Sequence, residues 1–451
     1  MSERTNFGSR IGVVLATAGS AVGLGNVWRF PYMVGNDGGA AFILIYIGCV
    51  LFLGIPGMIA EFSVGRNSAA NAARSYRKLA HKPYWGVIGY MGVFTSLIIL
   101  GFYSVVAGWC LHYFFASVAE QLQGDKDYII KYFNDFSSEA IRPSLMAVIF
   151  ILLTHYIVSH GIRQGIEKAS KMLMPTLFIL LIIIVVASCS LPGAWAGVEF
   201  LFKPDFTKLS HSVFLDALGQ AFFSLSLGTA CLCTYASYFN RNTDLGKAAV
   251  SIAFIDVLVA VLAGLMIFPA AFSVGVSPDQ GPSLIFITLP NVFMQAFFGL
   301  PALGYVISVL FYALMSLAAL TSTISMHEIG TAFFHEEFNL SRKGGAWIVT
   351  SICCVLAVLS SLSLGASENL CLFGMSFMDF FDFLTAQILM PIGSFLTCVF
   401  VGWHISKRVV YHEFTNHATL RGKMFKLWYF AVRYICPTAI LLIFLRQLGI
   451  L

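Results

Sequence analysis

Long apolar segments, each about the length of a membrane-spanning helix, follow one another along almost the whole chain. A helix needs roughly 20 apolar residues to cross a bilayer. By this criterion we place eleven spans, at 11–35, 40–64, 87–119, 143–160, 172–192, 213–239, 247–275, 302–334, 346–363, 375–403 and 428–448. The stretch 278–300 is rich in proline and glycine and predicts a short re-entrant or surface helix. The pattern therefore predicts an all-α polytopic membrane protein.

The first apolar segment is interrupted by residues that a lipid-facing helix does not tolerate. Residues 19–31 read GSAVGLGNVWRFP. In hydrocarbon, irregular backbone is tolerated only where protein covers it or where it lines a water-filled cavity. An ionisable residue such as Arg29 is expensive there and points to function. A broken helix with polar residues at mid-depth is where a secondary transporter binds its substrate.

The sixth segment carries a similar interruption, at Ser224, Ser226, Gly228 and Thr229. Small residues in a span also serve helix–helix packing, which is the alternative explanation. However, the first and sixth spans occupy matching positions if spans one to five and six to ten form two halves. An odd number of spans in each half requires the second half to be inverted, and paired interruptions then point to a central binding site. We expect one transporter domain over residues 1–451, with a first repeat at about 9–192, an inverted second repeat at about 212–403 and an extra helix at about 426–449.

Composition and charge agree with a membrane protein. The chain is 58% hydrophobic and 11% charged, with a mean hydropathy of +0.82, whereas soluble proteins carry about 25% charged residues. Nineteen Lys and Arg fall in the loops on one side of the predicted spans and six on the other. The positive-inside rule therefore predicts a cytoplasmic N-terminus and an extracytoplasmic C-terminus. These loops explain the net charge of +5, so no nucleic-acid partner is expected. We also find no catalytic motif, and the ten cysteines lie mostly inside spans as packing residues.

Several spaced motifs identify a family resemblance. The run AVGLGNVWRFP at 21–31 resembles the first-helix signature of the neurotransmitter:sodium symporter family, and QAFFSLSLG at 220–228, TYASY at 234–238 and ALTSTI at 319–324 are further matches. The resemblance extends from Arg4 to the last helix, and the lack of a twelfth span resembles the bacterial branch, with its leucine and hydrophobic amino-acid transporters. It implies a sodium-coupled amino-acid symporter that works by alternating access. The expected location is the lipid bilayer of a bacterial plasma (inner) membrane, as a monomer or weak homodimer.

The resemblance also implies how an amino acid binds. Its carboxylate and ammonium each need a partner out of water, and backbone N–H groups at the start of a half-helix suit an anion. By resemblance, the amides of Leu24 and Gly25 and the hydroxyl of Tyr103 receive the carboxylate. Carbonyl groups near Ala21, Phe223, Ser224 and Ser226 would receive the ammonium.

The resemblance maps the pocket for the substrate side chain to Ile99, Tyr103, Phe223, Ser226, Thr229, Ser322, Thr323 and Met326. Thr229 stands where relatives often carry phenylalanine or methionine, and the flexible Met326 can adapt to different shapes. Because the set contains no charged residue, we expect a medium or large neutral, hydrophobic amino acid. Amine-transporting relatives carry an aspartate at the position of Gly23. The glycine leaves room and no charge there, which favours an amino acid over a biogenic amine.

Two sodium ions are expected as co-substrates. Sodium is a hard cation that prefers several oxygen ligands. By resemblance, the first ion is held by the substrate carboxylate together with Ala21, Asn26, Ser224 and Asp256. The second would be held by carbonyls of Gly19, Val22 and Ala318 and by hydroxyls of Thr321 and Ser322. The alternative for these two hydroxyls is a bond to the preceding helical turn, as is common in membrane helices.

Asp256 lies in an apolar run, 252–268. A buried carboxylate must be protonated, paired or metal-bound. Chloride-dependent relatives typically carry asparagine here and a serine one turn later, whereas this chain has Asp256 and Ala260. We therefore expect no chloride requirement.

Gates would complete the transport cycle. By resemblance, Arg29 pairs with an acid on the tenth span, where Asp379 and Asp382 both fit and Asp382 is favoured, and Phe223 covers the substrate. On the inner side Arg4 would pair with Glu336, although both could be ordinary solvated charges.

Other functions remain open at this point. A proton-coupled carrier of the same fold would use Asp256 as its titrating group, and a sensor would bind an amino acid without moving it. A channel fits two inverted halves with broken helices less well.

Overall fold

The computed structural model describes residues 6–208, 210–275, 284–297, 299–367 and 370–447. Within them, nine helices are long and apolar enough to cross a membrane, although several contain a π-helical or 3₁₀ segment (η). They are α3 (Ala40–Cys49), η2 (Val50–Gly54) and α4 (Ile55–Ser68); η3 (Pro83–Trp85) and α6 (Gly86–Val118); α8 (Arg142–Ser159); η4 (Ile162–Glu167) and α9 (Lys168–Cys189); α13 (Leu245–Ser273); α15 (Pro301–Glu337); α16 (Arg342–Leu362); α17 (Phe377–Asp382), η7 (Phe383–Leu389), α18 (Met390–Val399) and η8 (Phe400–His404); and α20 (Phe425–Phe430), η9 (Ala431–Ile435) and α21 (Cys436–Gln447). The all-α polytopic fold predicted from the sequence is confirmed.

The first predicted span is broken, as expected. Helix α1 (Arg10–Ala21) and the helix formed by η1 (Gly25–Arg29) and α2 (Phe30–Asn36) are bent by 51° relative to each other and count as one further span. The sixth span does not pass as a continuous helix, because α11 (His211–Ser224) and α12 (Cys231–Ala236) are separated by non-helical residues. Eleven spans with the first and sixth broken were expected; nine continuous helices and one bent pair are found among the described residues, and the sixth span is interrupted as predicted.

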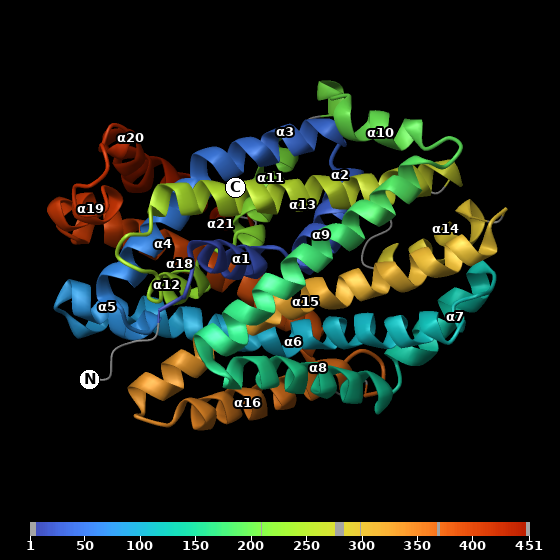
Figure 1. Ribbon diagram of the computed structural model, residues 1–451, viewed down its shortest axis with the longest axis horizontal. Helices are drawn as coiled ribbons and strands as arrows, with labels where there is room; N and C mark the ends of the chain where they lie inside the picture. The colour runs from blue at the N-terminus through green and yellow to red at the C-terminus, as the bar shows by residue number, and fades with distance from the viewer. Residues whose placement is uncertain (1–5, 209, 276–283, 298, 368–369, 448–451) are drawn as a thin grey trace.

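Short elements connect the spans at both ends. They are α5 (Ala72–Ala80), α7 (Lys126–Ser137), α10 (Trp195–Phe202), η5 (Phe206–Lys208), η6 (Leu284–Thr288), α14 (Leu289–Ala296), α19 (Lys407–Phe414) and the antiparallel strands β1 (Cys371–Leu372) and β2 (Met375–Ser376). A short apolar helix at Ile285–Ala296 agrees with the short re-entrant or surface helix predicted within 278–300. Residues 278–283 and 298 lie outside the described residues. In Figure 1 the long helices run along the horizontal axis, with α5 and α19 at one end and α7 and α14 at the other.

Polar caps start several helices where the chain leaves a loop. The hydroxyls of Ser9 and Ser341 accept hydrogen bonds from the amides of Gly12 and Gly344 at 3.0 and 3.1 Å, and the Asp244 carboxylate accepts one from Lys247 N at 3.0 Å. Such a cap contributes about 1 kcal/mol to helix stability. These contacts fix where α1, α13 and α16 begin.

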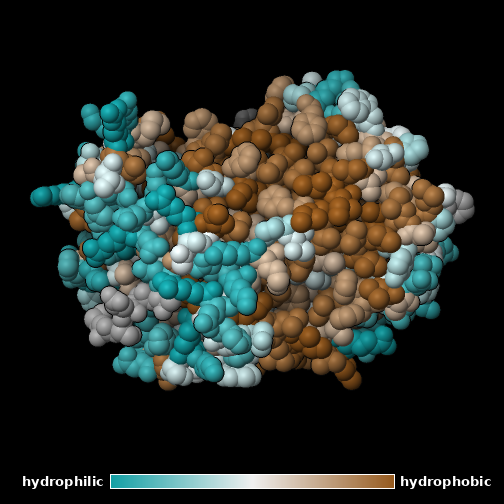
Figure 2. Space-filling model, viewed as in Figure 1, coloured by the Kyte–Doolittle hydropathy of each residue, from teal (hydrophilic) through white to brown (hydrophobic). Residues whose placement is uncertain are grey.

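The half-helix α12 packs closely on α4. A Cβ atom added at Gly65 would lie 2.0 Å from the carbonyl oxygen of Cys233, so only glycine permits this approach. Around the helices, Figure 2 shows a broad hydrophobic area over the middle of the face, with hydrophilic residues gathered toward the end that carries α5. A hydrophobic surface of this kind fits contact with lipid rather than water. The division of the chain into two inverted repeats remains a prediction.

Candidate functional site

The break in the first span exposes backbone amides beside a tyrosine from α6. The Gly23 amide donates to Asn26 Oδ1 at 3.1 Å, and the Leu24 amide donates to the Tyr103 hydroxyl at 3.0 Å. Because a hydroxyl oxygen that accepts one bond can still donate its own proton, Tyr103 keeps a donor for an anion. The amide of Leu24 and the hydroxyl of Tyr103 are therefore adjacent, as the carboxylate site requires.

The break in the sixth span is held by an acidic side chain. Ser226, Gly228 and Ala230 all adopt positive φ angles, of 53°, 79° and 62°, which ends the helix after α11. The buried Glu61 carboxylate on α4 accepts a hydrogen bond from the Gly228 amide at 2.7 Å. A Cβ atom at Gly228 would lie 2.3 Å from the carbonyl oxygen of Met390. The sequence analysis missed Glu61, because only the fold brings α4 to this break.

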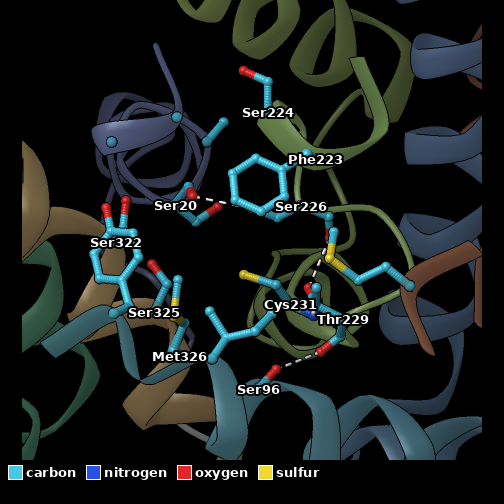
Figure 3. Close-up of a pocket in the computed structure, with 16 residues that line it drawn as sticks. Ser20, Ser96, Phe223, Ser224, Ser226, Thr229, Cys231, Ser322, Ser325 and Met326 are labelled. Atoms are coloured by element: carbon cyan, nitrogen blue, oxygen red, sulfur yellow. Dashed lines mark hydrogen bonds between the residues drawn. The ribbon is translucent and has the colours of Figure 1, made fainter. Parts of the chain in front are cut away.

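A pocket lies between the two breaks and contains most of the predicted substrate residues (Figure 3). From the predicted set, its wall includes Ala21, Gly25, Ile99, Tyr103, Phe223, Ser224, Ser226, Thr229, Ser322 and Met326. The sequence analysis missed Ser20, Ser96, Cys231, Ser325 and Met390, which also line it. Ser226 Oγ donates to the carbonyl oxygen of Ser20 at 3.2 Å, and Ser96 Oγ donates to that of Thr229 at 2.7 Å. These bonds tie the unwound sixth segment to α1 and α6.

Two predicted residues occupy different positions. Thr323 does not line the pocket, because its hydroxyl lies 2.9 Å from that of Thr154 on α8 and the side chain is fully buried between the helices. Its assignment to the pocket is corrected. Leu24 is not part of the pocket lining either, although its amide bonds to Tyr103. The expectation of free room at Gly23 is also wrong, because a Cβ atom there would lie 2.2 Å from Ser322 Oγ and 2.9 Å from the Tyr103 hydroxyl.

The first predicted sodium cluster is assembled around Asp256. Asn26 Nδ2 donates to Asp256 Oδ1 at 2.7 Å, and Ser224 Oγ donates to the same atom at 2.8 Å. Tyr46 on α3, which the sequence analysis missed, donates to Asp256 Oδ2 at 2.9 Å. Asp256 is fully buried, and none of the salt bridges among the described residues includes it. A buried carboxylate with only neutral partners requires a proton or a cation.

The second predicted cluster joins the end of α1 to the middle of α15. The carbonyl oxygen of Val22 accepts bonds from Thr321 Oγ1 at 3.1 Å and from Ser322 Oγ at 3.4 Å. Thr321 Oγ1 also reaches the carbonyl oxygen of Ala318 at 2.9 Å, and a Cβ atom at Gly19 would lie 3.4 Å from Thr321 Cβ. The five residues therefore meet, and the bond to Ala318 is the helix back-bond that the alternative explanation expects.

Next to the pocket, Arg29 lies over the aromatic ring of Phe223, which lines it. Its Cζ atom is 4.4 Å from the centre of the Phe223 ring, within the range of a cation–π contact. Its charge is attracted by Asp382 and by Asp216, a residue of α11 that the sequence analysis missed. Among the described residues no carboxylate lies within ion-pair distance of Arg29. A direct pair with Asp382 is thus not formed in this structure.

The other candidate gate residues have different neighbours. Asp379 accepts a local hydrogen bond from Ser376 Oγ at 2.7 Å at the start of α17. Asp37, which lies just beyond α2, is not among the predicted gate residues; burial and the negative charge of Asp216 raise its pKa to about 6. At the end of α15, Glu336 accepts bonds from Asn71 N and Nδ2 at 2.8 and 3.1 Å. Its predicted partner, Arg4, lies outside the described residues.

We predict that Arg29→Ala lowers transport more than equilibrium substrate binding. The substitution removes the cation–π contact and the attraction to the acids. Both stabilise the closed gate, by about 1–2 kcal/mol together, so the transport rate should fall roughly tenfold. Uptake and binding on the same purified protein measure both. Asp382→Asn and Asp216→Asn should act similarly, whereas Asp379→Asn serves as the matched control. An equal effect of Asp379→Asn would reject this choice of acids.

Comparison with known proteins decides the family. The sequence model of the Sodium:neurotransmitter symporter family matches residues 4–132 and 127–450. The chain belongs to this family. An uncharacterized sodium-dependent transporter, YhdH, of Bacillus subtilis (strain 168) is 38% identical over 455 residues, which cover 100% of both chains. An uncharacterized sodium-dependent transporter of Haemophilus influenzae is 34% identical, with 99% of this chain and 98% of that protein covered.

The fold of this chain is also similar to a solved crystal structure. The crystal structure of MhsT in complex with L-phenylalanine matches with a TM-score of 0.89 and 40% sequence identity, over 98% of this chain and 100% of that one. Proteins of the Sodium:neurotransmitter symporter family are transporters rather than enzymes, so this chain is a multi-pass membrane transporter with the LeuT-type fold.

Proposed function

We propose that this protein is a sodium-coupled symporter of neutral, medium-to-large hydrophobic amino acids, and that it needs no chloride. The observation that carries the proposal is that an uncharged pocket adjoins a buried carboxylate, Asp256 on α13, which is hydrogen-bonded by Asn26 and Ser224 from the two broken spans. The described lining of the pocket contains no Asp, Glu, Lys or Arg. Ser224 belongs both to this lining and to the hydrogen-bond partners of Asp256, which supports coupling between substrate and ion.

The substrate would bind through its backbone groups. The Leu24 and Gly25 amides and the Tyr103 hydroxyl suit a carboxylate, because N–H and O–H groups at a half-helix start favour an anion. The carbonyl groups at the two breaks, near Ala21 and Ser226, suit the ammonium. The L-phenylalanine bound by the related MhsT supports a hydrophobic amino acid as the substrate class.

Sodium would enter as a second substrate at two places. Asp256, Asn26, Ser224 and the carbonyl of Ala21, with the substrate carboxylate, offer one oxygen-rich site, since hard cations take oxygen ligands. Gly19, Val22, Ala318, Thr321 and Ser322 offer the other. The sodium dependence in the names of both bacterial relatives supports this choice of ion.

The fixed charge of Asp256 would replace chloride. Without such a charge, a sodium ion and a zwitterionic substrate leave a net positive charge in a low-dielectric site, which an anion must balance. Asp256 supplies one negative charge, and Tyr46, Asn26 and Ser224 hydrogen-bond to it. We also infer an N-terminus in the cytoplasm, from the positive-inside distribution of loop charges, and a location in a bacterial plasma membrane.

Uptake into proteoliposomes tests this function. With sodium outside, we expect accumulation of labelled L-phenylalanine or L-leucine that stops when choline replaces sodium. Uptake driven instead by an inward proton gradient without sodium would favour the proton-coupled alternative. Sodium-dependent binding with no accumulation would favour an amino-acid sensor.

The size of the pocket gives a further prediction. Thr229→Phe adds a ring to the wall between Ser96 and Ser226, so the preference should move to smaller amino acids. A misfit of methylene size costs about 1–3 kcal/mol, or 10- to 200-fold in selectivity. Competition of labelled substrate with a series from alanine to tryptophan measures the shift. Thr323→Val, at the neighbouring threonine that does not line the pocket, is the control. Unchanged selectivity in Thr229→Phe would remove this residue from the pocket.

A further inference from the structure

An arginine in the last membrane span has no acidic partner among the described residues. Arg433 lies in η9, about 12 Å along the helix from its first residue at 1.5 Å per residue. Its Nε atom is buried without a hydrogen-bond partner, and in the described part of the chain its guanidinium forms no ion pair with a carboxylate. Its contacts are aromatic: Cζ lies 4.4 Å from the centre of the Trp403 ring and 5.5 Å from that of Tyr434. An intramembrane arginine normally pairs with an acid or lines a pathway, and Arg433 does neither.

The arginine stands at the polar end of an apolar groove between η8–α18 and η9–α21. Phe395 and Val399 form one wall, and Pro437, Thr438 and Leu441 form the other. The two helices cross closely beside Gly402, where an added Cβ atom would lie 2.9 Å from Arg433 Cα. The rim is open to the membrane, because Trp403, Tyr434 and Leu441 are 56%, 44% and 43% exposed. Exposed tryptophan and tyrosine are typical of the level where lipid headgroups begin.

The surrounding segment carries uncompensated positive charge. Residues 405–433 contain six Lys and Arg but a single acidic residue, Glu413. That carboxylate is buried and paired with Arg66 at 2.7 Å, so it neutralises none of the six. One of the six, Lys407, lies with its Nζ atom 5.4 Å from the Tyr429 ring, and the Tyr429 hydroxyl donates to the carbonyl oxygen of Gly402 at 3.0 Å. The cluster therefore reaches the same helix crossing as Arg433.

We propose that this groove binds an anionic glycerophospholipid, with its phosphate against Arg433 and an acyl chain along Val399, Thr438 and Leu441. A guanidinium offers several N–H donors to phosphate oxygens, and basic pockets between membrane helices suit acidic headgroups. The apolar groove suits a hydrocarbon chain and not a soluble anion. The site is separate from the substrate pocket, with which its lining shares no residue.

The test uses the full-length protein in nanodiscs of phosphatidylcholine with a minor fraction of phosphatidylglycerol. Mass spectrometry of the protein after transfer to mild detergent counts the retained phosphatidylglycerol. Arg433→Gln removes the charge, and Thr438→Trp fills the groove while leaving the charge. Lys343→Gln, an exposed residue outside the groove lining, is the matched control for one lost positive charge. We expect about fivefold weaker retention in Arg433→Gln, as for the loss of one basic group at an anionic surface. We also expect weaker retention in Thr438→Trp, because the filled groove excludes the acyl chain, and wild-type retention in the control.

Three results would overturn the proposal. Equal loss in Lys343→Gln would mean attraction by overall charge, and wild-type retention in Arg433→Gln would mean that the two aromatic rings alone accommodate the guanidinium. Displacement of the lipid by soluble glycerol 3-phosphate would also contradict it, because the site would then bind a free phosphate group. If Arg433→Gln does not fold, Arg433→Lys replaces it, with a smaller loss expected because lysine lacks the planar fork.

Discussion

Asp256→Asn is expected to abolish sodium-driven uptake while leaving the protein folded. The asparagine keeps the size of the side chain and can still bond to Tyr46 and Ser224, but it removes the only charge in this buried cluster. Removing one partner of a buried charge pair typically costs about 2–5 kcal/mol, so sodium affinity should fall by more than an order of magnitude. Uptake measured across a sodium titration reports the loss.

Chloride provides the control for the same substitution. Replacing chloride by gluconate should leave wild-type uptake unchanged, because Asp256 supplies the negative charge. Tyr46→Phe, which removes one hydrogen bond but no charge, should weaken sodium affinity by a smaller factor of roughly threefold to tenfold, because a typical hydrogen bond contributes about 0.5–1.5 kcal/mol net. Normal uptake by Asp256→Asn in chloride-free buffer would show that the charge is not needed for coupling.

Gly23→Ala is expected to weaken substrate binding strongly. The added methyl carbon would lie 2.2 Å from Ser322 Oγ and 2.9 Å from the Tyr103 hydroxyl. Relief of this clash requires Ser322 to leave the Val22 carbonyl or Tyr103 to leave the Leu24 amide. Either movement displaces a residue that is proposed to bind sodium or the substrate. The cost of overpacking, about 1–3 kcal/mol, then adds to the loss of that contact. Substrate affinity should therefore fall at least tenfold.

Gly48→Ala is the matched control, because an added Cβ atom there meets no atom within 4 Å. Its substrate affinity and thermal stability should match those of the wild type. Calorimetric titration of the two variants with substrate in sodium buffer makes the comparison. Wild-type affinity in Gly23→Ala would place the substrate away from this break.

The sequence predicts local features of the site well and long-range contacts poorly. Composition and apolar length give the spans, and clustered Gly, Ser and Asn residues give the two breaks. The partners of Asp256 at Asn26 and Ser224 follow from the family resemblance. By contrast, Tyr46 lies on a helix without any polar interruption that would single it out. Glu61 is an ionisable residue inside the predicted span 40–64 and could have been singled out on that ground, but only the packing of α3 and α4 against the breaks reveals the contacts of both residues.

The assignment of Thr323 to the pocket has a related physical cause. Thr321, Ser322 and Thr323 are consecutive on α15, and successive residues of a helix are rotated by about 100° from one another. Thr321 and Ser322 reach the Val22 carbonyl, so Thr323 is turned toward Thr154 on α8. The unwound sixth segment agrees with the prediction, because clustered Ser, Gly and Thr residues mark the interruption that hydropathy alone does not show.

The central claim is that sodium and the substrate carboxylate bind together beside Asp256. Purified protein titrated with L-phenylalanine and with phenethylamine, its decarboxylated analogue, in sodium and in choline buffer tests it most directly. Each hydrogen bond to the charged carboxylate contributes about 1.5–3 kcal/mol to binding. We therefore predict that the amino acid binds at least tenfold more tightly than the amine in sodium buffer. In choline buffer this difference in affinity should disappear. Equal affinity for the amine and the amino acid, or binding of the amino acid that is unchanged without sodium, would contradict the account.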